Sequence, residues 1–243
     1  EEKVFTFTDI SRLSNQAANY FQSLGIKKGT VVMLILRRRW EYWICAVALH
    51  KIGAILIPGS LQLAKKDLIY RGNSAQIHTM VCLDDKYVLE QVNEAQPSVP
   101  SIQHKIVVGG SHEGWRNFHE EVEKFPTEFA RPTGEAGTKA HDLMLVYFTS
   151  GTTGEPKMVA HDFTYPLGHI VTGSFWHNLD ENSLHLTIAD TGWGKAVWGK
   201  LYGQWIAGAN IFVYDHEKFT PAAILEKIQE YQVTSLCAPP TIF

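Results

Sequence analysis

Hydrophobic and polar positions in the first half of the chain follow two alternating periods. Apolar residues recur at helical spacing over 7–24, and a continuous apolar run at 31–36 has the length of a buried strand. A second helical face then leads into another short apolar run at 54–57. Further signals of the two kinds follow at 65–73 (helix), 78–82 (strand) and 105–108 (strand). Helices that alternate with unbroken apolar strands predict an α/β fold with a mostly parallel sheet flanked by helices.

The second half continues this alternation after a polar segment. Residues 126–141 are rich in Pro, Gly, Thr and charge. We expect them to separate a first α/β subdomain at 1–135 from a second at 136–243, although one long surface loop within a single domain has the same composition. At 184–188, Leu and Ile alternate with His185 and Thr187, a pattern typical of a half-buried strand.

A loop with the sequence TSGTTGEPK lies between an apolar run at 143–148 and a short strand-like run at 157–160. The loop is therefore predicted to join two strands as a hairpin. Its glycines let the backbone approach an anion closely, its hydroxyls and amides can donate hydrogen bonds, and its lysine adds a positive charge. The residues concerned are Thr149, Ser150, Gly151, Thr152, Thr153, Gly154 and Lys157. This composition favours a phosphate site over a plain polar turn, but the spacing is not that of the G-x-x-x-x-G-K-[ST] nucleotide loop.

Composition and charge narrow the choice of partners. The 243 residues carry a formal net charge of −3, and a basic cluster lies at 37–39, which we interpret as a solvated helix start, with an anion-binding role as the less favoured alternative. Neither a nucleic acid nor an anionic membrane is expected as a partner, and no apolar run is long enough to predict a membrane span. The 11 histidines show no metal-ligand spacing, so no metal site is predicted.

The cysteines and the ends of the chain bear on its setting. Cys45, Cys82 and Cys237 each lie in an apolar run, which predicts buried free thiols in a reducing compartment, and we expect the cytoplasm. The chain opens without an initiator Met and stops in apolar residues, so we expect an excised piece of a longer protein.

Residues 147–157 resemble the AMP-binding signature of the adenylate-forming superfamily, which includes acyl-CoA and aryl-CoA synthetases. Flanking segments that resemble the same family lie in the order that it shows, at 7–10, 49–58, 189–193 and 237–241. Met158 after the loop, and the run Ala-Pro-Pro-Thr at 238–241, are most similar to medium-chain acyl-CoA synthetases. The resemblance implies a partial large N-terminal domain, with the small C-terminal domain absent.

The resemblance also implies an activity and roles for residues. The family uses ATP with Mg²⁺ to activate a small-molecule carboxylic acid as an acyl-adenylate, and then transfers the acyl group to CoA. Residues 149–154 would embrace the β- and γ-phosphates, and Lys157 would support the departing pyrophosphate, unless it is only a solvated strand-end lysine. Trp193 and Gly194 would line the acyl pocket, although Trp193 could equally be a core aromatic. We expect a short- or medium-chain acid as substrate, no activity of these residues alone, and make no prediction of oligomeric state.

Other readings of the same residues stay open. An aryl-CoA ligase and an adenylation domain that loads a carrier protein would share the loop. A non-catalytic module could keep the fold and use it only for binding.

Overall fold

The computed structural model describes residues 2–149 and 154–242, and the chain divides into two compact units. The first unit comprises Glu1–Leu36 and Glu41–Phe163, and the second comprises Arg37–Trp40 and Thr164–Phe243. Within the described residues, no helix is long and apolar enough to cross a membrane.

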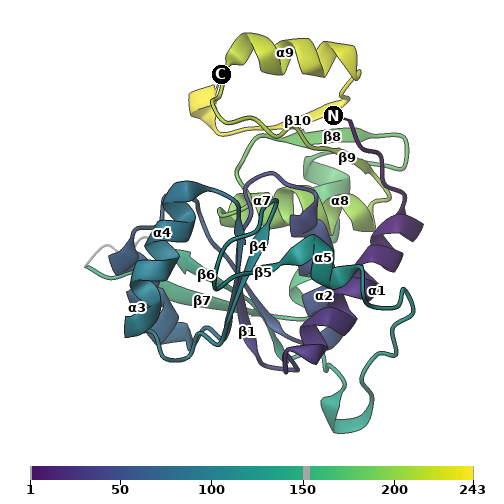
Figure 1. Ribbon diagram of the computed structural model, residues 1–243. Coiled ribbons are helices and arrows are strands. Elements are labelled where there is room, and N and C mark those ends of the chain that lie inside the picture. Colours follow the sequence, from purple (N-terminus) through teal and green to yellow (C-terminus); the bar gives the residue numbers. More distant parts are fainter. Residues whose placement is uncertain (1, 150–153, 243) are drawn as a thin grey trace. The chain divides into compact units, whose positions relative to one another are not determined.

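A seven-stranded sheet forms the centre of the first unit, in the order β5-β4-β3-β1-β2-β6-β7 (Figure 1). Its strands are β1 (Val31–Ile35), β2 (Ile55–Pro58), β3 (Thr79–Leu83), β4 (His104–Val108), β5 (Arg116–Asn117), β6 (Leu143–Thr149) and β7 (Lys157–Asp162). Every neighbouring pair is parallel except β6 and β7, which are antiparallel. The α/β fold with a mostly parallel sheet is thus confirmed.

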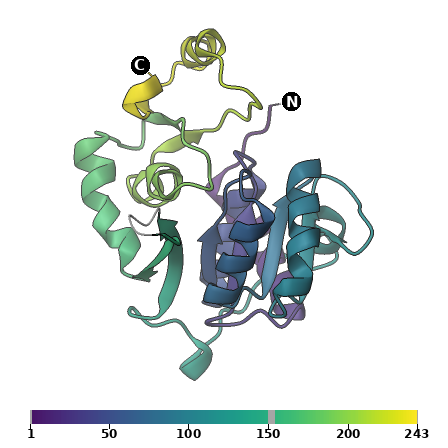
Figure 2. The same cartoon turned by 90° about the vertical axis from the view of Figure 1, so that its left-hand side faces the viewer.

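Helices cover both faces of this sheet, as the two views in Figures 1 and 2 show. They are α1 (Phe7–Ser23), α2 (Glu41–Ile52), α3 (Lys65–Ala75), α4 (Lys86–Ala95) and α5 (Phe118–Val122), with short 3₁₀ turns at Gln96–Ser98 and Gly134–Ala136. In β1, Met33 and Ile35 share an apolar core with Leu68 of α3 and Val92 of α4. Because successive strand side chains point to opposite faces, the alternate positions Val32 and Leu34 face the side of α1 and α2. All of these strand residues are buried, as a sheet covered on both faces requires.

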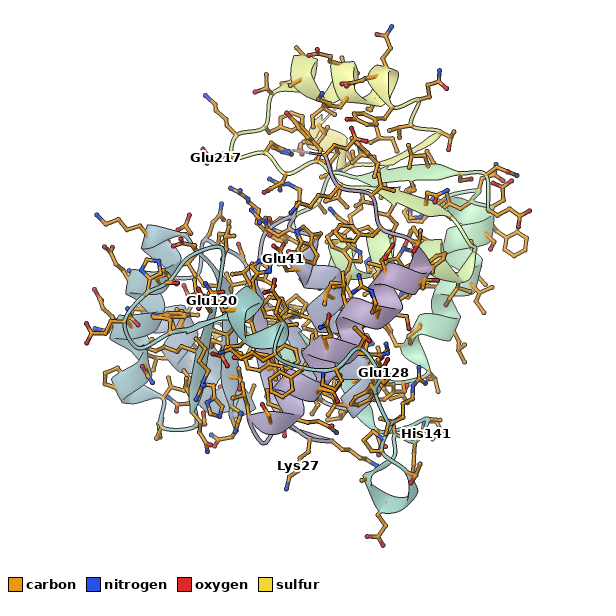
Figure 3. All side chains as sticks on the ribbon, turned by 45° about the vertical axis from the view of Figure 1, so that its right-hand side comes forward. Lys27, Glu41, Glu120, Glu128, His141 and Glu217 are labelled. Atoms are coloured by element: carbon orange, nitrogen blue, oxygen red, sulfur yellow. The ribbon has the colours of Figure 1, made fainter. Side chains whose placement is uncertain are left out.

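One buried carboxylate lies at the first residue of α2. Glu41 is fully buried, and its Oε1 lies 3.2 Å from Nε2 of His119 on α5. Figure 3 shows Glu41 inside the ribbon, whereas Lys27 points outward from it. A helix N-terminus favours a negative charge, so the position of Glu41 offsets part of the cost of its burial.

The polar segment 126–141 lies within the first unit. Side-chain amides of α1 donate to its backbone carbonyls: Asn15 to Thr127 at 2.7 Å, and Asn19 to Glu128 at 2.8 Å. The chain then returns to the same sheet, where Leu145 of β6 is the register partner of Leu56 on β2. The division into compact units therefore falls after Phe163 and does not coincide with the expected boundary after residue 135.

The second unit has a three-stranded parallel sheet in the order β10-β8-β9. Its elements are α6 (Tyr165–Val171), η3 (Thr172–Trp176), β8 (Leu184–Thr187), α7 (Gly194–Val197), η4 (Trp198–Tyr202), α8 (Gly203–Ile206), β9 (Asn210–Phe212), α9 (Pro221–Glu230), β10 (Ser235–Cys237) and η5 (Pro240–Ile242). Figure 1 shows α9 on one side of this sheet. Leu186 packs with Ile224 of α9, whereas His185 and Thr187 are buried against Gly199 of η4. The expectation of a half-buried strand is therefore wrong, because η4 covers the second face.

Candidate functional site

The hairpin β6–β7 carries the predicted phosphate loop, and the expected hairpin is confirmed. The two strands pair from Leu143 opposite Asp162 to Thr149 opposite Lys157. At the loop end, the hydroxyl of Thr149 donates to the carbonyl of Lys157 at 3.5 Å. The structure thus brings together the first and last residues of the proposed loop. The predicted site residues Ser150, Gly151, Thr152 and Thr153 lie outside the described residues.

In the described part of the loop, Gly154 has a backbone conformation that favours glycine. Gly154 has φ of +129°, a backbone conformation that side chains of L-residues rarely adopt. Among the described residues other than its chain neighbours, none has an atom within 4 Å of the Cβ that a substitution would add, so the positive φ is the reason for glycine that these residues show. Lys157, two residues after Glu155, is exposed. An exposed ammonium group is suited to an anionic group that arrives from solvent.

The predicted acyl-pocket residues belong to the second unit. Trp193 is 61% exposed and directly precedes α7, which begins at Gly194. Its amide donates to the carbonyl of Asp190 at 3.0 Å, and the amide of Gly192 donates to Oδ1 of Asp190 at 2.9 Å. This turn presents the indole at the surface of its unit, so Trp193 is not a core aromatic there.

Sequence reasoning missed the partners of the basic cluster. Nη2 of Arg37 donates to Oδ2 of Asp215 at 3.0 Å, and Nε lies 2.7 Å from Oδ1 of the same carboxylate, so the two side chains form an ion pair. Nη1 of Arg38 lies 3.4 Å from Oδ2 of Asp190, and its Nη2 donates to the carbonyl of His216. The interpretation as a solvated helix start is wrong for these two arginines, because they form partly buried ion pairs within the second unit. Acidic residues more than 150 positions away gave no signal in the sequence.

Lys200 is a second residue that the sequence did not single out. It is 2% exposed and lies in η4, where its φ of −150° interrupts the helical geometry. Burial, with the nearby Arg38 as the next cause, lowers the pKa of Lys200 to about 7. Its charge therefore responds to pH near neutrality, unlike that of an exposed lysine.

Metal-ligating side chains do not cluster in the part of the chain that the structure describes: no group of three or more His, Cys, Asp or Glu residues there could hold a metal ion.

Comparison with known proteins agrees with this fold. The family described as "AMP-binding enzyme" matches residues 1–243. The human protein "Acyl-coenzyme A synthetase ACSM5, mitochondrial" is 36% identical over 242 residues, which cover 98% of this chain and 41% of that protein. The protein "Acyl-coenzyme A synthetase ACSM3, mitochondrial" of Pongo abelii is 33% identical over 246 residues, which cover 100% of this chain and 41% of that protein. The chain therefore spans about two fifths of the length of these curated relatives.

A solved structure shows the same fold. The crystal structure of the anthranilate CoA ligase AuaEII in complex with anthranoyl-AMP superposes with a TM-score of 0.87 at 23% identity, over 96% of this chain and 44% of that one. A mostly parallel sheet flanked by helices is thus shared with that ligase. The chain belongs to the AMP-binding enzyme family. Its curated relatives are acyl-CoA synthetases.

Proposed function

We propose that these residues are the front part of an ATP-dependent acyl-CoA synthetase that activates a short- or medium-chain fatty acid. The observation that carries this proposal is the match along the whole chain, at 33% and 36% identity, to relatives that bear this name. The hairpin supports it, because Thr149 and Lys157 meet at the end where a phosphate group would bind.

The first step of the proposed reaction solves a chemical difficulty, since a carboxylate is a poor electrophile. A carboxylate oxygen of the acid attacks the α-phosphorus of ATP, and the bond from that phosphorus to the bridging oxygen breaks. Pyrophosphate leaves with the electron pair, and an acyl-adenylate forms. Positioning and charge neutralisation supply most of the catalysis in such a transfer.

The second step uses CoA as the acceptor. The thiol sulfur attacks the acyl carbon of the mixed anhydride, and AMP leaves with the electron pair of the broken C–O bond. The thiol proton is released to solvent or a base. The products are acyl-CoA, AMP and pyrophosphate, so every atom of the three substrates is accounted for.

Each site residue has a proposed part in this reaction. Thr149 and Gly154, with the four loop residues between them, contact the β- and γ-phosphates of ATP through hydroxyl and amide donors. Lys157 neutralises charge that develops on the departing pyrophosphate. Trp193 and Gly194 form part of the wall against the acyl chain, which suits an apolar ring presented at the surface of a turn.

Magnesium is proposed as the metal that accompanies ATP. Mg²⁺ keeps several waters and commonly binds through substrate phosphates and one or two carboxylates. This mode fits a loop of hydroxyl, amide and ammonium donors, which supplies hydrogen bonds and positive charge but no carboxylate cluster among the described residues. When bound, the cation would neutralise phosphate charge, as Lys157 does from the protein side.

Product analysis tests this proposal. The complete enzyme, meaning these residues together with the remaining length of such a synthetase, is incubated with ATP, Mg²⁺, CoA and one acid at a time from acetate to palmitate, and with benzoate. We expect acyl-CoA and AMP in equal amounts, with the highest kcat/KM for an acid of about four to ten carbons. Preference for benzoate would instead indicate an aryl-CoA ligase, and formation of acyl-adenylate without transfer to CoA would indicate a carrier-loading domain. Binding of ATP without turnover of any acid would indicate a non-catalytic module.

We further propose that the 243 residues alone are inactive, because they span about two fifths of the relatives' length. ATP–pyrophosphate exchange by this segment at the rate of the complete enzyme would contradict this.

The proposed compartment is the cytoplasm, supported by three buried free cysteines that suit a reducing environment. The names of the two curated relatives place those proteins in mitochondria, so imaging of a fluorescent fusion distinguishes the two locations.

A further inference from the structure

Two adjacent residues of α3 contact the hairpin on either side of its loop. The hydroxyl of Tyr70 donates to the carbonyl of Pro156 at 3.0 Å. Pro156 directly precedes Lys157, and a proline has no backbone N–H, so its carbonyl is the one backbone group through which it can be held by a hydrogen bond. Tyr70 therefore fixes the backbone at the point where the chain leaves the loop and enters β7.

Arg71 contacts the other strand, at the point where the chain enters the loop. The carbon of its guanidinium group lies 4.9 Å from the centre of the Phe148 ring, and the Tyr70 ring meets the same ring at 6.5 Å and 70°. Phe148 also packs against the core beneath α3 and α4. Nε of Arg71 is buried and has no hydrogen-bond partner among the described residues, so the aromatic face, together with the nearby carboxylate of Asp67, offsets part of the cost of burying the guanidinium group. Phe148 directly precedes Thr149.

The contacts of Tyr70 and Arg71 hold the two ends of the loop that is proposed to bind phosphate. Thr149 and Lys157 are register partners, and each follows directly after a residue that α3 holds. Preorganised donors stabilise developing charge because they need no reorganisation during the reaction. A displacement of about 1 Å can reduce the rate of a positioned reaction by about 100-fold.

We propose that Tyr70 and Arg71 are positioning residues for the phosphate-binding hairpin, and that they set its affinity for the triphosphate of ATP through Lys157 and Thr149. The inference rests on the proposed function of the hairpin. Tyr70 and Arg71 lie about 80 positions before the hairpin in the sequence and are not part of its nucleotide-binding signature.

Three substitutions separate this role from general packing. Tyr70→Phe removes one hydroxyl and keeps the ring against Phe148. Arg71→Lys keeps the charge and removes the planar group that covers the ring. Tyr87→Phe, at a 46% exposed tyrosine on α4, is the matched control for loss of a hydroxyl.

Kinetics of the complete enzyme form the first readout. We expect Tyr70→Phe and Arg71→Lys each to raise the KM for ATP about fivefold, the effect of one lost hydrogen bond or stacked pair, with the KM for the acid unchanged. Tyr87→Phe leaves both values as in the wild type. An unchanged KM for ATP in both variants overturns the proposal. Equal increases in both KM values together with a lower melting temperature also overturn it, because they indicate a merely structural role.

Hydrogen–deuterium exchange of the same protein forms the second readout and needs no activity. We expect Tyr70→Phe to accelerate amide exchange at 154–160, with α1 and α2 unchanged. If the wild type catalyses no reaction with any acid, the proposed function fails, and this exchange result alone then decides whether Tyr70 positions the hairpin. Wild-type exchange at 154–160 in Tyr70→Phe overturns the inference in either case.

Discussion

Arg38 and Asp190, which are 152 residues apart in the chain, lie 3.4 Å apart through Nη1 and Oδ2. The other oxygen of Asp190 accepts a hydrogen bond from the amide of Gly192. The same carboxylate therefore forms the turn that leads to Trp193 and joins that turn to the segment Arg37–Trp40 of the second unit. The hydroxyl of Thr191 makes a further contact, to the carbonyl of Arg37.

Two substitutions of Asp190 are predicted to distinguish the contribution of its ion pair with Arg38 from that of its hydrogen bond with Gly192. Asp190→Asn keeps an oxygen that can accept from Gly192 and loses the charge that faces Arg38, so we expect a loss of about 1 kcal/mol in the free energy of unfolding. Asp190→Ala loses both contacts and leaves Arg38 partly buried without this partner, so we expect a loss of about 2 to 3 kcal/mol. Urea denaturation measures both values. The control is Glu90→Ala, which breaks an exposed pair with Lys86 and should change stability by less than about 0.5 kcal/mol. Wild-type stability of Asp190→Ala would contradict the importance of this turn.

Lys157 is predicted to act on the reaction and not on stability. Lys157→Ala in the complete enzyme should lower the rate of acyl-adenylate formation by about 100-fold. The reason is that the substitution removes the positive charge that stabilises the departing pyrophosphate. The melting temperature should stay unchanged, since the side chain is exposed. Single-turnover measurement of pyrophosphate release checks the rate. Lys86→Ala, at a lysine whose side chain is 90% exposed, should keep the wild-type rate. If Lys157→Ala also kept it, Lys157 would be only a solvated strand-end lysine.

His185 is predicted to make the second unit sensitive to acid. Its Nε2 lies 3.1 Å from the carbonyl of Gly199, which can only accept, so Nε2 carries a proton, and Nδ1 lies 3.0 Å from the hydroxyl of Ser235. Burial lowers the pKa of His185 to about 4, from an ordinary value of 6.5. The unfolded chain therefore takes up a proton at a higher pH than the folded chain. The stability from neutral His185 is present above pH 6.5 and is lost as the pH falls from 6.5 towards 4, by up to about 3 kcal/mol.

Denaturation of the wild type and of His185→Gln at several pH values checks this prediction. The difference in the free energy of unfolding between the two proteins should shrink as the pH falls through this window. A difference that stays constant from pH 7 to pH 4 would show that His185 does not titrate in this range.

Trp193 is predicted to affect the choice of acid. Trp193→Ala in the complete enzyme should change the ratio of kcat/KM between butyrate and octanoate by about tenfold, since an apolar wall discriminates chain length by a few methylene contacts. Stability should be almost unaffected, because the indole is 61% exposed. Trp176→Ala removes an indole of similar exposure, 63%, from the same unit and serves as the control. An unchanged ratio in Trp193→Ala would remove this residue from the acyl pocket.

Local patterns in the sequence predict much of the fold and the position of the loop. The apolar run at 31–36 could be read as a buried strand because both faces of β1 are covered by helices. The hairpin could be predicted because two strand-like runs flank a segment rich in glycine and hydroxyl groups, and Gly154 has the backbone conformation that this composition favours.

Contacts between distant residues could not be predicted in this way. Arg37 and Arg38 have the pattern of a solvated basic cluster until the fold brings Asp215 and Asp190 to them. Tyr70 and Arg71 are ordinary helix residues until β6 and β7 lie against α3. His185 occupies the position of a solvent-facing residue on β8, and only the packing of η4 shows that it is buried. In each case the environment of the residue is set by a partner that is distant in the sequence, and local composition does not predict that contact.

Acid-dependent ATP–pyrophosphate exchange in the absence of CoA tests the central claim most directly. The complete enzyme is mixed with ATP, Mg²⁺ and labelled pyrophosphate, with and without hexanoate, and the label that appears in ATP is counted. The proposed function predicts exchange that requires the acid and falls about 100-fold in Lys157→Ala. A folded wild-type protein that shows no exchange with any carboxylic acid, or equal exchange without one, would contradict it.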